Sequence, residues 1–223
     1  MTRVAALLFD LDGTLVHSDP LHFAVFQELL GEYGIELDWE TFQTKISGRT
    51  NELVLPDFLP ELAAEHAAIG DRKEAMFRAR LSARVEPMPG IETLLDRAEA
   101  EGIRVAVVTN APRENAVAML AATGLAPRFP LVIAGGDAAW PKPNPAPYRL
   151  AMVKLGLTPE LSVVFEDSLA GLAAGRASGA HVFGLASSLD PDALLAAGAH
   201  VAITDFNDPA LHAHLDQAKV RTT

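Results

Sequence analysis

The chain of 223 residues contains no cysteine, and its 18 lysine and arginine residues are outnumbered by 29 aspartate and glutamate residues. The absence of cysteine excludes a disulfide framework, a thiolate metal site and a cysteine nucleophile. The formal net charge of −11 disfavours nucleic acid and anionic membrane surfaces as partners, because both attract clustered basic side chains. A small anionic substrate stays compatible with this charge, because the local field of a site can oppose the global one.

Long apolar runs are also missing. No stretch approaches the ~18 apolar residues of a membrane span, and Asp10 interrupts the apolar N-terminal run early. We therefore expect a cytoplasmic protein with no membrane partner, and a monomer, since nothing indicates a large exposed apolar seam. The hydrophobic content of 49% is enough for a substantial core.

Short runs rich in valine, isoleucine and phenylalanine alternate with helical patterns over most of the chain. This alternation predicts a parallel α/β sheet with helices on both faces. The expected strands are Val4–Phe9, Arg104–Val108, Leu131–Ala134, Ser162–Phe165, His181–Leu185 and Val201–Ile203, and the expected helices are Ile91–Glu101, Arg113–Thr123, Ala146–Leu155, Leu169–Ser178, Pro191–Ala197 and a C-terminal one.

The segment after the first strand breaks this alternation. It shows helical patterns and no convincing strand, and one long helix is expected over Glu61–Arg84. We expect an α/β core, a doubly wound Rossmann-like parallel sheet formed by residues 1–15 and 86–223, with an all-helical cap, residues 16–85, inserted in it. An insert at this point lies over the carboxyl end of the first strand, where open α/β sheets bind ligands.

Polar residues follow four of the expected strands. Asp10 and Asp12 follow the first strand, Thr109-Asn110 the second, Lys142 lies in a proline-rich loop after the third, and Glu166-Asp167-Ser168 ends the fourth. In a parallel sheet these positions share one edge. Several carboxylates gathered there suit Mg²⁺, while a lysine, a hydroxyl and free backbone N–H groups suit a phosphate. Taken singly, Thr109 is equally compatible with a helix cap, Lys142 with a solvated lysine, and Glu166-Asp167 with a helix-dipole pair.

The ordered set of these four motifs resembles the haloacid dehalogenase-like hydrolases, and the resemblance spans essentially the whole chain. It implies that Asp10 is a nucleophile that forms an aspartyl-phosphate, and that Asp12 is the general acid and base. It also implies a Mg²⁺ held by the Asp10 carboxylate, the Asp12 backbone carbonyl and Asp167, with Glu166 either a ligand or one shell further out. Thr109 and the Asn110 N–H would bind phosphoryl oxygens, and Lys142 would bridge Asp10 and the phosphate.

Residues of the cap extend the resemblance to the subgroup of β-phosphoglucomutase and small sugar-phosphate phosphatases. His22, Gly48 and Arg49 are similar to that subgroup, which implies substrate contacts for His22 and Arg49. His22 also shares a helical face with Phe26, so a packing histidine is an equal alternative. Where several mutases carry a lysine before the cap glycine and an arginine three residues after it, this chain has Ser47 and Asn51, and Asn51 becomes a candidate substrate contact.

The resemblance implies a Mg²⁺-dependent phosphatase that hydrolyses small phosphorylated metabolites such as sugar phosphates. Asp12 argues against dehalogenases and phosphonate-cleaving relatives, which lack this second aspartate. A β-phosphoglucomutase-like phosphohexomutase with the same aspartyl-phosphate is the alternative. A phosphate-accepting receiver module is disfavoured, because such modules are about half this length and have no helical cap after the first strand. The resemblance also implies that the cap selects the substrate, and the sequence therefore does not identify that substrate.

Overall fold

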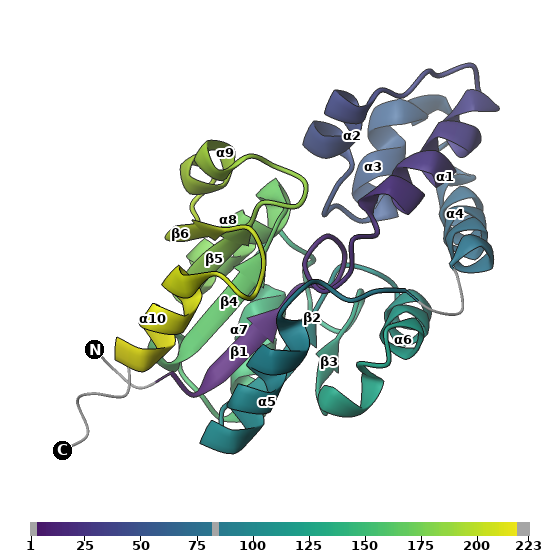
Figure 1. The fold of residues 1–223 in the computed structure, drawn as a ribbon. Helices are drawn as coiled ribbons and strands as arrows, with labels where there is room; N and C mark the ends of the chain where they lie inside the picture. Colours follow the sequence, from purple (N-terminus) through teal and green to yellow (C-terminus); the bar gives the residue numbers. More distant parts are fainter. Residues whose placement is uncertain (1–3, 82–84, 218–223) are drawn as a thin grey trace.

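A sheet of six parallel strands forms the centre of the molecule (Figure 1). The computed structural model describes residues 4–81 and 85–217. The strand order is β3-β2-β1-β4-β5-β6, so the first strand of the chain lies between β2 and β4. The strands are β1 (Ala6–Phe9), β2 (Arg104–Val108), β3 (Val132–Ile133), β4 (Ser162–Glu166), β5 (His181–Leu185) and β6 (Val201–Ile203).

Helices cover both faces of the sheet because successive strand residues point to opposite sides. In β1, Leu7 and Phe9 join an apolar cluster with α5, α6 and α10, whereas Ala6 and Leu8 join a second cluster with α7, α8 and α9. In Figure 1, α5 and α10 lie in front of the sheet and α7 lies behind it. These helices are α5 (Ile91–Glu101), α6 (Arg113–Ala122), α7 (Ala146–Leu155), α8 (Leu169–Ser178), α9 (Pro191–Ala196) and α10 (Pro209–Gln217).

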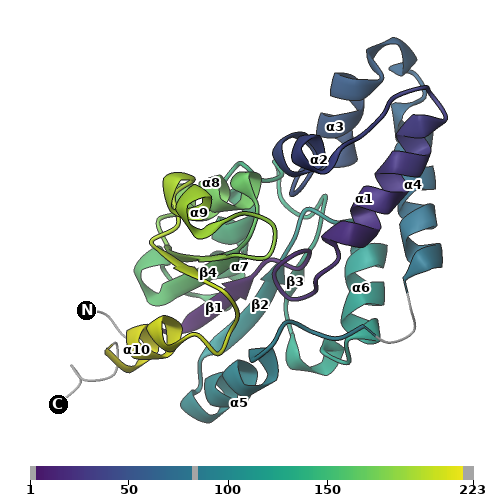
Figure 2. The ribbon, with the colours of Figure 1, turned by 45° about the horizontal axis from the view of Figure 1, so that its top comes forward.

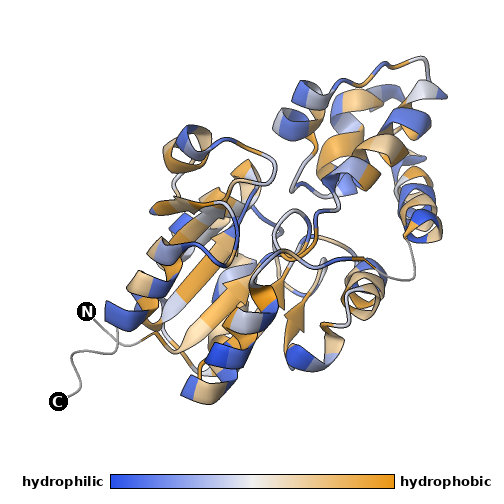
Figure 3. Ribbon diagram, viewed as in Figure 1, coloured by the Kyte–Doolittle hydropathy of each residue, from blue (hydrophilic) through white to orange (hydrophobic). Residues whose placement is uncertain are grey.

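The remaining helices form a cap beyond the carboxyl ends of the strands (Figures 1 and 2). They have an apolar cluster of their own, in which Phe26, Leu29, Phe42 and Leu55 are buried. In Figure 3 the strands are largely hydrophobic, whereas the helices of the core and of the cap carry both hydrophobic and hydrophilic residues. The cap helices are α1 (Asp19–Gly31), α2 (Trp39–Lys45), α3 (Asn51–Phe58) and α4 (His66–Arg80).

The expected doubly wound α/β core with an inserted helical cap is confirmed, and each expected strand occurs within two residues of its predicted bounds. Buried parallel strands are recognisable because both faces are apolar, which gives continuous apolar runs. Among the described residues, no helix is long and apolar enough to cross a membrane.

The helix expected over Glu61–Arg84 is wrong at its start. A 3₁₀ turn occupies Pro60–Leu62, and α4 begins only at His66. The side chain of His66 contacts the Leu59 carbonyl at 2.7 Å, and Leu59 itself is fully buried in the cap. This contact closes a turn before α4, and tertiary contacts of this kind override local helix propensity. Residues 82–84, at the predicted end of this helix, lie outside the described residues.

Candidate active site

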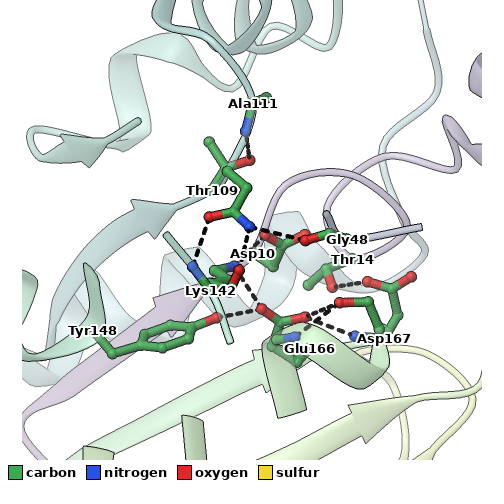
Figure 4. A network of polar contacts seen from close by, with 12 residues as sticks. Asp10, Thr14, Gly48, Thr109, Ala111, Lys142, Tyr148, Glu166 and Asp167 are labelled. Atoms are coloured by element: carbon green, nitrogen blue, oxygen red, sulfur yellow. Dashed lines mark hydrogen bonds and ion pairs between the residues drawn. The ribbon is translucent and has the colours of Figure 1, made fainter. Parts of the chain in front are cut away.

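The carboxyl ends of three neighbouring strands hold the polar side chains singled out by the motifs (Figure 4). Asp10 directly follows β1, Thr109 directly follows β2, and Glu166 ends β4 with Asp167 next in the chain. Because β1 lies between β2 and β4, these side chains meet at one edge of the sheet. All four residues are at most 8% exposed. The sequence pattern therefore converges on a single buried polar cluster.

Three carboxylates crowd together in this cluster. Asp10, Glu166 and Asp167 each place a carboxylate oxygen within 4.8 Å of the others. Burial, reinforced by the neighbouring carboxylates, raises the pKa of Asp10 and of Asp167 well above the ordinary value. Crowded, buried negative charge is costly without a cation, and a donor set made only of oxygen suits Mg²⁺. The residues present thus fit a magnesium ion.

Lys142 lies beside this cluster as a buried counter-charge. Its Nζ donates to Asp10 Oδ1 and to Glu166 Oε1, both at 2.5 Å, and the residue is 1% exposed. Burial lowers the pKa of Lys142, but the two carboxylates outweigh it, and the pKa is raised. The lysine therefore stays charged at neutral pH.

Asn110 fixes the backbone around Lys142. Its Oδ1 accepts from the Lys142 N–H at 3.0 Å, and its Nδ2 donates to the Lys142 carbonyl at 3.1 Å. The same Nδ2 donates to the Gly48 carbonyl of the cap at 2.9 Å. The Asn110 side chain thus joins the loop that contains Lys142 to the cap. This role is separate from the predicted phosphate contact, which involves the backbone N–H of Asn110.

Glu166 has a partner that the sequence did not reveal. The Tyr148 hydroxyl, on α7, donates to Glu166 Oε1 at 2.7 Å, and the tyrosine is fully buried. Glu166 Oε2 accepts from the Asp167 N–H and the Ser168 hydroxyl, each at 3.3 Å. A tyrosine on a buried helix face carries no signal of such a contact. With so many donors around it, Glu166 is held as a fixed acceptor next to Lys142.

Asp12 lies outside the group of three carboxylates and contacts the start of the cap helix α1. Its Oδ1 accepts from the Ser18 hydroxyl at 2.6 Å and lies 2.9 Å from His22 Nε2. Burial raises the pKa of Asp12, but the contacts with His22 and Ser18 outweigh it, so the pKa is lowered. This placement leaves the Asp12 backbone carbonyl, rather than its carboxylate, for the metal role that the resemblance implies.

His22 both packs and carries a polar contact. Its ring stacks on Phe77 with centroids 4.0 Å apart, and its Nδ1 lies 3.1 Å from Lys73 Nζ. A lysine ammonium can only donate, so Nδ1 accepts and Nε2 carries the proton that it donates to Asp12. The contact with Asp12 is a third possibility, distinct from the packing and substrate alternatives that the sequence left open.

Thr109 and Gly13 lie close to the same cluster. The Thr109 Oγ1 accepts from the Ala111 N–H at 3.0 Å, which leaves its hydroxyl hydrogen for another acceptor. Gly13 has φ +73°, and a Cβ built there would lie 2.0 Å from Asp167 Oδ2. Only glycine allows the loop after β1 to pass so close to the Asp167 carboxylate.

A cavity of about 670 Å³ opens between the cap and the core, and it reaches this cluster. This size is typical of small-molecule sites. Its lining includes the motif residues of the core and all three candidate cap residues: Asp10, Asp12, Thr109, Asn110, Lys142, His22, Arg49 and Asn51. The structure therefore gathers nearly every predicted site residue around one space.

Arg49 and Asn51 line the cavity, but their polar atoms already have partners in the cap. Arg49 pairs with Asp57 at 2.9 Å and donates to the Lys45 and Leu53 carbonyls. Asn51 donates to Glu74 at 2.7 Å. Substrate contacts by these two residues stay predictions, and a ligand would have to compete with these partners.

Comparison with known proteins assigns the chain to a family. Residues 7–185 match the sequence profile described as haloacid dehalogenase-like hydrolase, which covers most of the chain. The chain belongs to this family. The matched residues include all four motifs, so the predicted resemblance and the hydrolase class are confirmed.

Relatives of this hydrolase include a protein named as a sugar-phosphate phosphatase. It is 34% identical to Protein CbbY of Rhodobacter capsulatus over 81% of this chain and 84% of that protein. It is 33% identical to the fructose-1-phosphate phosphatase YqaB of Escherichia coli strain K12, over 79% of this chain and 94% of that protein. The structure of CbbY from Rhodobacter sphaeroides in complex with phosphate is similar with a TM-score of 0.83, at 30% identity, over 96% of this chain and 99% of that one.

Proposed function

We propose that this hydrolase is a Mg²⁺-dependent phosphatase that cleaves small phosphorylated metabolites, sugar phosphates above all, through an aspartyl-phosphate. The observation that carries the proposal is the buried group of Asp10, Asp167 and Lys142 at the base of a cavity large enough for a sugar phosphate. The similarity to a fructose-1-phosphate phosphatase and to a phosphate-bound CbbY structure supports the same chemistry.

The first half of the proposed reaction transfers the phosphoryl group to Asp10. An Asp10 carboxylate oxygen forms a bond to phosphorus as the bond between phosphorus and the substrate oxygen breaks. The Lys142 ammonium neutralises charge shared between Asp10 and the phosphoryl oxygens, while Thr109 and the Asn110 N–H donate to those oxygens. A bound Mg²⁺ would supply further neutralisation of the phosphate charge, with Asp10, Asp167 and the Asp12 carbonyl as its protein ligands and Glu166 beside it.

Asp12 handles the protons in both halves. A phosphate dianion next to Asp12 raises the pKa of its carboxyl, which favours a protonated acid that can donate to the departing oxygen. The ionised Asp12 then accepts a proton from water, and the resulting hydroxide attacks phosphorus, which releases phosphate and restores Asp10. The contacts from His22 and Ser18 hold the carboxylate on the cavity side of the loop.

We further propose that residues 1–15 and 86–223 form the catalytic core and residues 16–85 the cap. Val16 and Pro87 form an isolated bridge, so the two connecting segments lie side by side where the cap joins the core. The separate apolar cluster of the cap supports this division. Because the cavity lies within one chain and metabolites of this class are intracellular, we propose a monomeric cytoplasmic enzyme.

The test is a panel of sugar phosphates assayed for both released phosphate and isomerised product. We expect Mg²⁺-dependent phosphate release that EDTA abolishes and that falls at least about 1,000-fold in Asp10→Asn, since the nucleophile is lost. Isomerised sugar phosphate with little free phosphate would identify a phosphohexomutase instead. Full activity in Asp10→Asn would refute the assignment of the nucleophile.

A further inference from the structure

Asn115 connects the core to the cap through a fully buried amide. It lies on α6 and is 0% exposed. Its Nδ2 donates to Glu74 Oε2 at 2.5 Å, and its Oδ1 accepts from Arg78 at 2.7 Å. Glu74 and Arg78 are one turn apart on the cap helix α4, which packs against α6 (Figure 2). A reversed amide would turn its oxygen toward a carboxylate and its NH₂ toward a guanidinium, so charge fixes its orientation.

The contact at Glu74 continues inside the cap. Glu74 Oε1 accepts from Lys73 Nζ at 2.9 Å and from Asn51 at 2.7 Å. Lys73 and Glu74 are 5% and 7% exposed, so water can do little to replace a lost partner. A buried charge that loses one of its partners is destabilised, so its side chain shifts and the side chains bonded to it shift as well.

Lys73 carries the chain of contacts to the reacting groups. Its Nζ reaches His22 Nδ1 at 3.1 Å, and His22 Nε2 reaches Asp12 Oδ1 at 2.9 Å. An unbroken series of side-chain contacts therefore runs from Asn115 in the core, through the cap, and back to Asp12 in the core. The series is complete only while α4 is docked on α6.

We propose that Asn115 is a positioning residue that couples docking of the cap helix α4 to the orientation of the Asp12 carboxyl. The inference rests on the proposed function, in which Asp12 gives a proton to the departing oxygen. When Asn115 holds Glu74 and Arg78, Lys73 keeps His22 against Asp12, and the acid is aimed into the cavity. When this link is cut, Asp12 keeps its bond from Ser18 but loses the restraint from His22, while the Asp10, Lys142 and Asp167 group is untouched.

The loss of activity on cutting the Asn115 link should depend on the leaving group of the substrate. A sugar alkoxide needs a proton as it departs, whereas p-nitrophenolate leaves well without one. The ratio kcat/KM reports the steps up to phosphoryl transfer, and thus excludes the later hydrolysis, in which Asp12 acts as base. A residue that merely stabilises the fold would change both esters alike, so comparing the two separates positioning from stability.

The experiment measures kcat/KM for p-nitrophenyl phosphate and for the best sugar phosphate of the panel in the wild type, Asn115→Ala and Glu114→Ala. We expect Asn115→Ala to lose about 10- to 100-fold on the sugar phosphate and less than about 3-fold on the aryl ester. Glu114→Ala removes an exposed side chain from the same turn of α6 and should change neither value. Equal losses on both esters, or no loss on the sugar phosphate, would overturn the proposal.

A pair of substitutions tests the direction of the bond. Asn115→Asp alone places a carboxylate against Glu74 and should lose as much on the sugar phosphate as Asn115→Ala. Adding Glu74→Gln restores a donor and an acceptor across the contact, because the introduced amide can donate to the new carboxylate and still accept from Lys73 and Asn51. We expect the double variant to regain most of the sugar-phosphate activity, and no regain contradicts the coupling.

Failure of the proposed function looks different. If the wild type releases no phosphate from either ester with Mg²⁺, both the phosphatase assignment and the inference fall. If the wild type is active and Asp10→Asn is not, the phosphatase assignment stands and the results for Asn115 decide the inference alone.

Discussion

At the scale of single residues, His181 gives the chain a sensitivity to acid that is separate from its site. Its ring stacks between those of His200 and His214, at centroid distances of 4.5 and 4.1 Å, at the amino end of β5. Burial, followed by the nearby His214, His200 and Arg176, lowers the pKa of His181 to about 4. Within the described residues, its Nε2 is buried without a hydrogen-bond partner.

The lowered pKa predicts a loss of stability in mild acid. The unfolded chain takes up a proton at His181 near pH 6.5, whereas the folded chain resists it down to about pH 4. The contribution of His181 to the free energy of unfolding is therefore fully present above pH 6.5 and is lost as the pH falls from 6.5 toward 4. We expect about 1 kcal/mol less unfolding free energy at pH 5 than at pH 7 from this group, after allowance for its partial exposure. Urea unfolding of His181→Phe should show a flatter pH dependence; an unchanged slope would contradict the assignment.

The site residues that could be predicted from the sequence are those that directly follow a recognisable strand. Asp10, Thr109 and Asp167 each follow a recognisable strand, so the edge where they meet followed from the parallel topology. Tyr148 and Asn115 could not be placed, because each contacts a residue on a distant element from a helix face that looks like ordinary core. Contacts of this kind depend on how helices dock, which no local pattern encodes.

At the scale of elements, α8 approaches β4 closely at a glycine. A Cβ at Gly171, in the first turn of α8, would lie 1.9 Å from the Glu166 carboxylate. We expect Gly171→Ala to displace Glu166 from Lys142 and Tyr148, lower kcat/KM at least about tenfold and reduce stability by about 1–3 kcal/mol.

The matched control is Gly31→Ala. Gly31 also lies in a helix, but a Cβ there meets nothing within 4 Å. We expect this variant to keep full activity and to gain about 0.4–1 kcal/mol of stability, because alanine restricts the unfolded chain. Kinetics and thermal unfolding of both variants are the measurements. Equal behaviour of the two variants would show that space around Glu166 is not limiting.

The elements themselves were predictable to different degrees. The strands of the core are recognisable in the sequence as apolar runs. The helix ends are recognisable by the glycines that follow them, such as Gly102 and Gly156. The start of α4 at His66 was not predictable, since the turn before it depends on a contact with the Leu59 carbonyl. The sequence of the cap contains few helix start and stop signals, and tertiary contacts determine where its short helices begin and end.

At the scale of the whole molecule, the cap rests on the core at Gly48. This residue has φ +72°, and a Cβ there would lie 2.3 Å from the Ser168 hydroxyl oxygen. Gln43 of the cap also bonds to the Ser188 carbonyl of the core. We expect Gly48→Ala to hold the cap off the core and to lower kcat/KM about 10- to 100-fold, because the cavity no longer closes over its ligand.

Gly34→Ala separates this effect from backbone strain. Gly34 lies in the cap with φ +75°, nearly the same as Gly48, but a Cβ there meets nothing within 4 Å. Both variants carry the cost of a left-handed alanine, of about 1–2 kcal/mol, and should lower the melting temperature alike. Only Gly48→Ala should lose activity, and an equal loss in Gly34→Ala would show that cap contact at this point does not matter.

If Asp10 carries the phosphoryl group during turnover, it is the residue that is phosphorylated in enzyme quenched with acid during hydrolysis of a sugar phosphate with Mg²⁺. Peptide mapping should find an acid-stable, base-labile phosphate on the peptide that contains Asp10, absent with EDTA and absent in Asp10→Asn. Phosphate on another residue would contradict this assignment. So would rapid wild-type turnover with no phosphorylated enzyme even in Asp12→Asn supplied with p-nitrophenyl phosphate, whose leaving group needs no proton and whose intermediate should hydrolyse slowly in this variant.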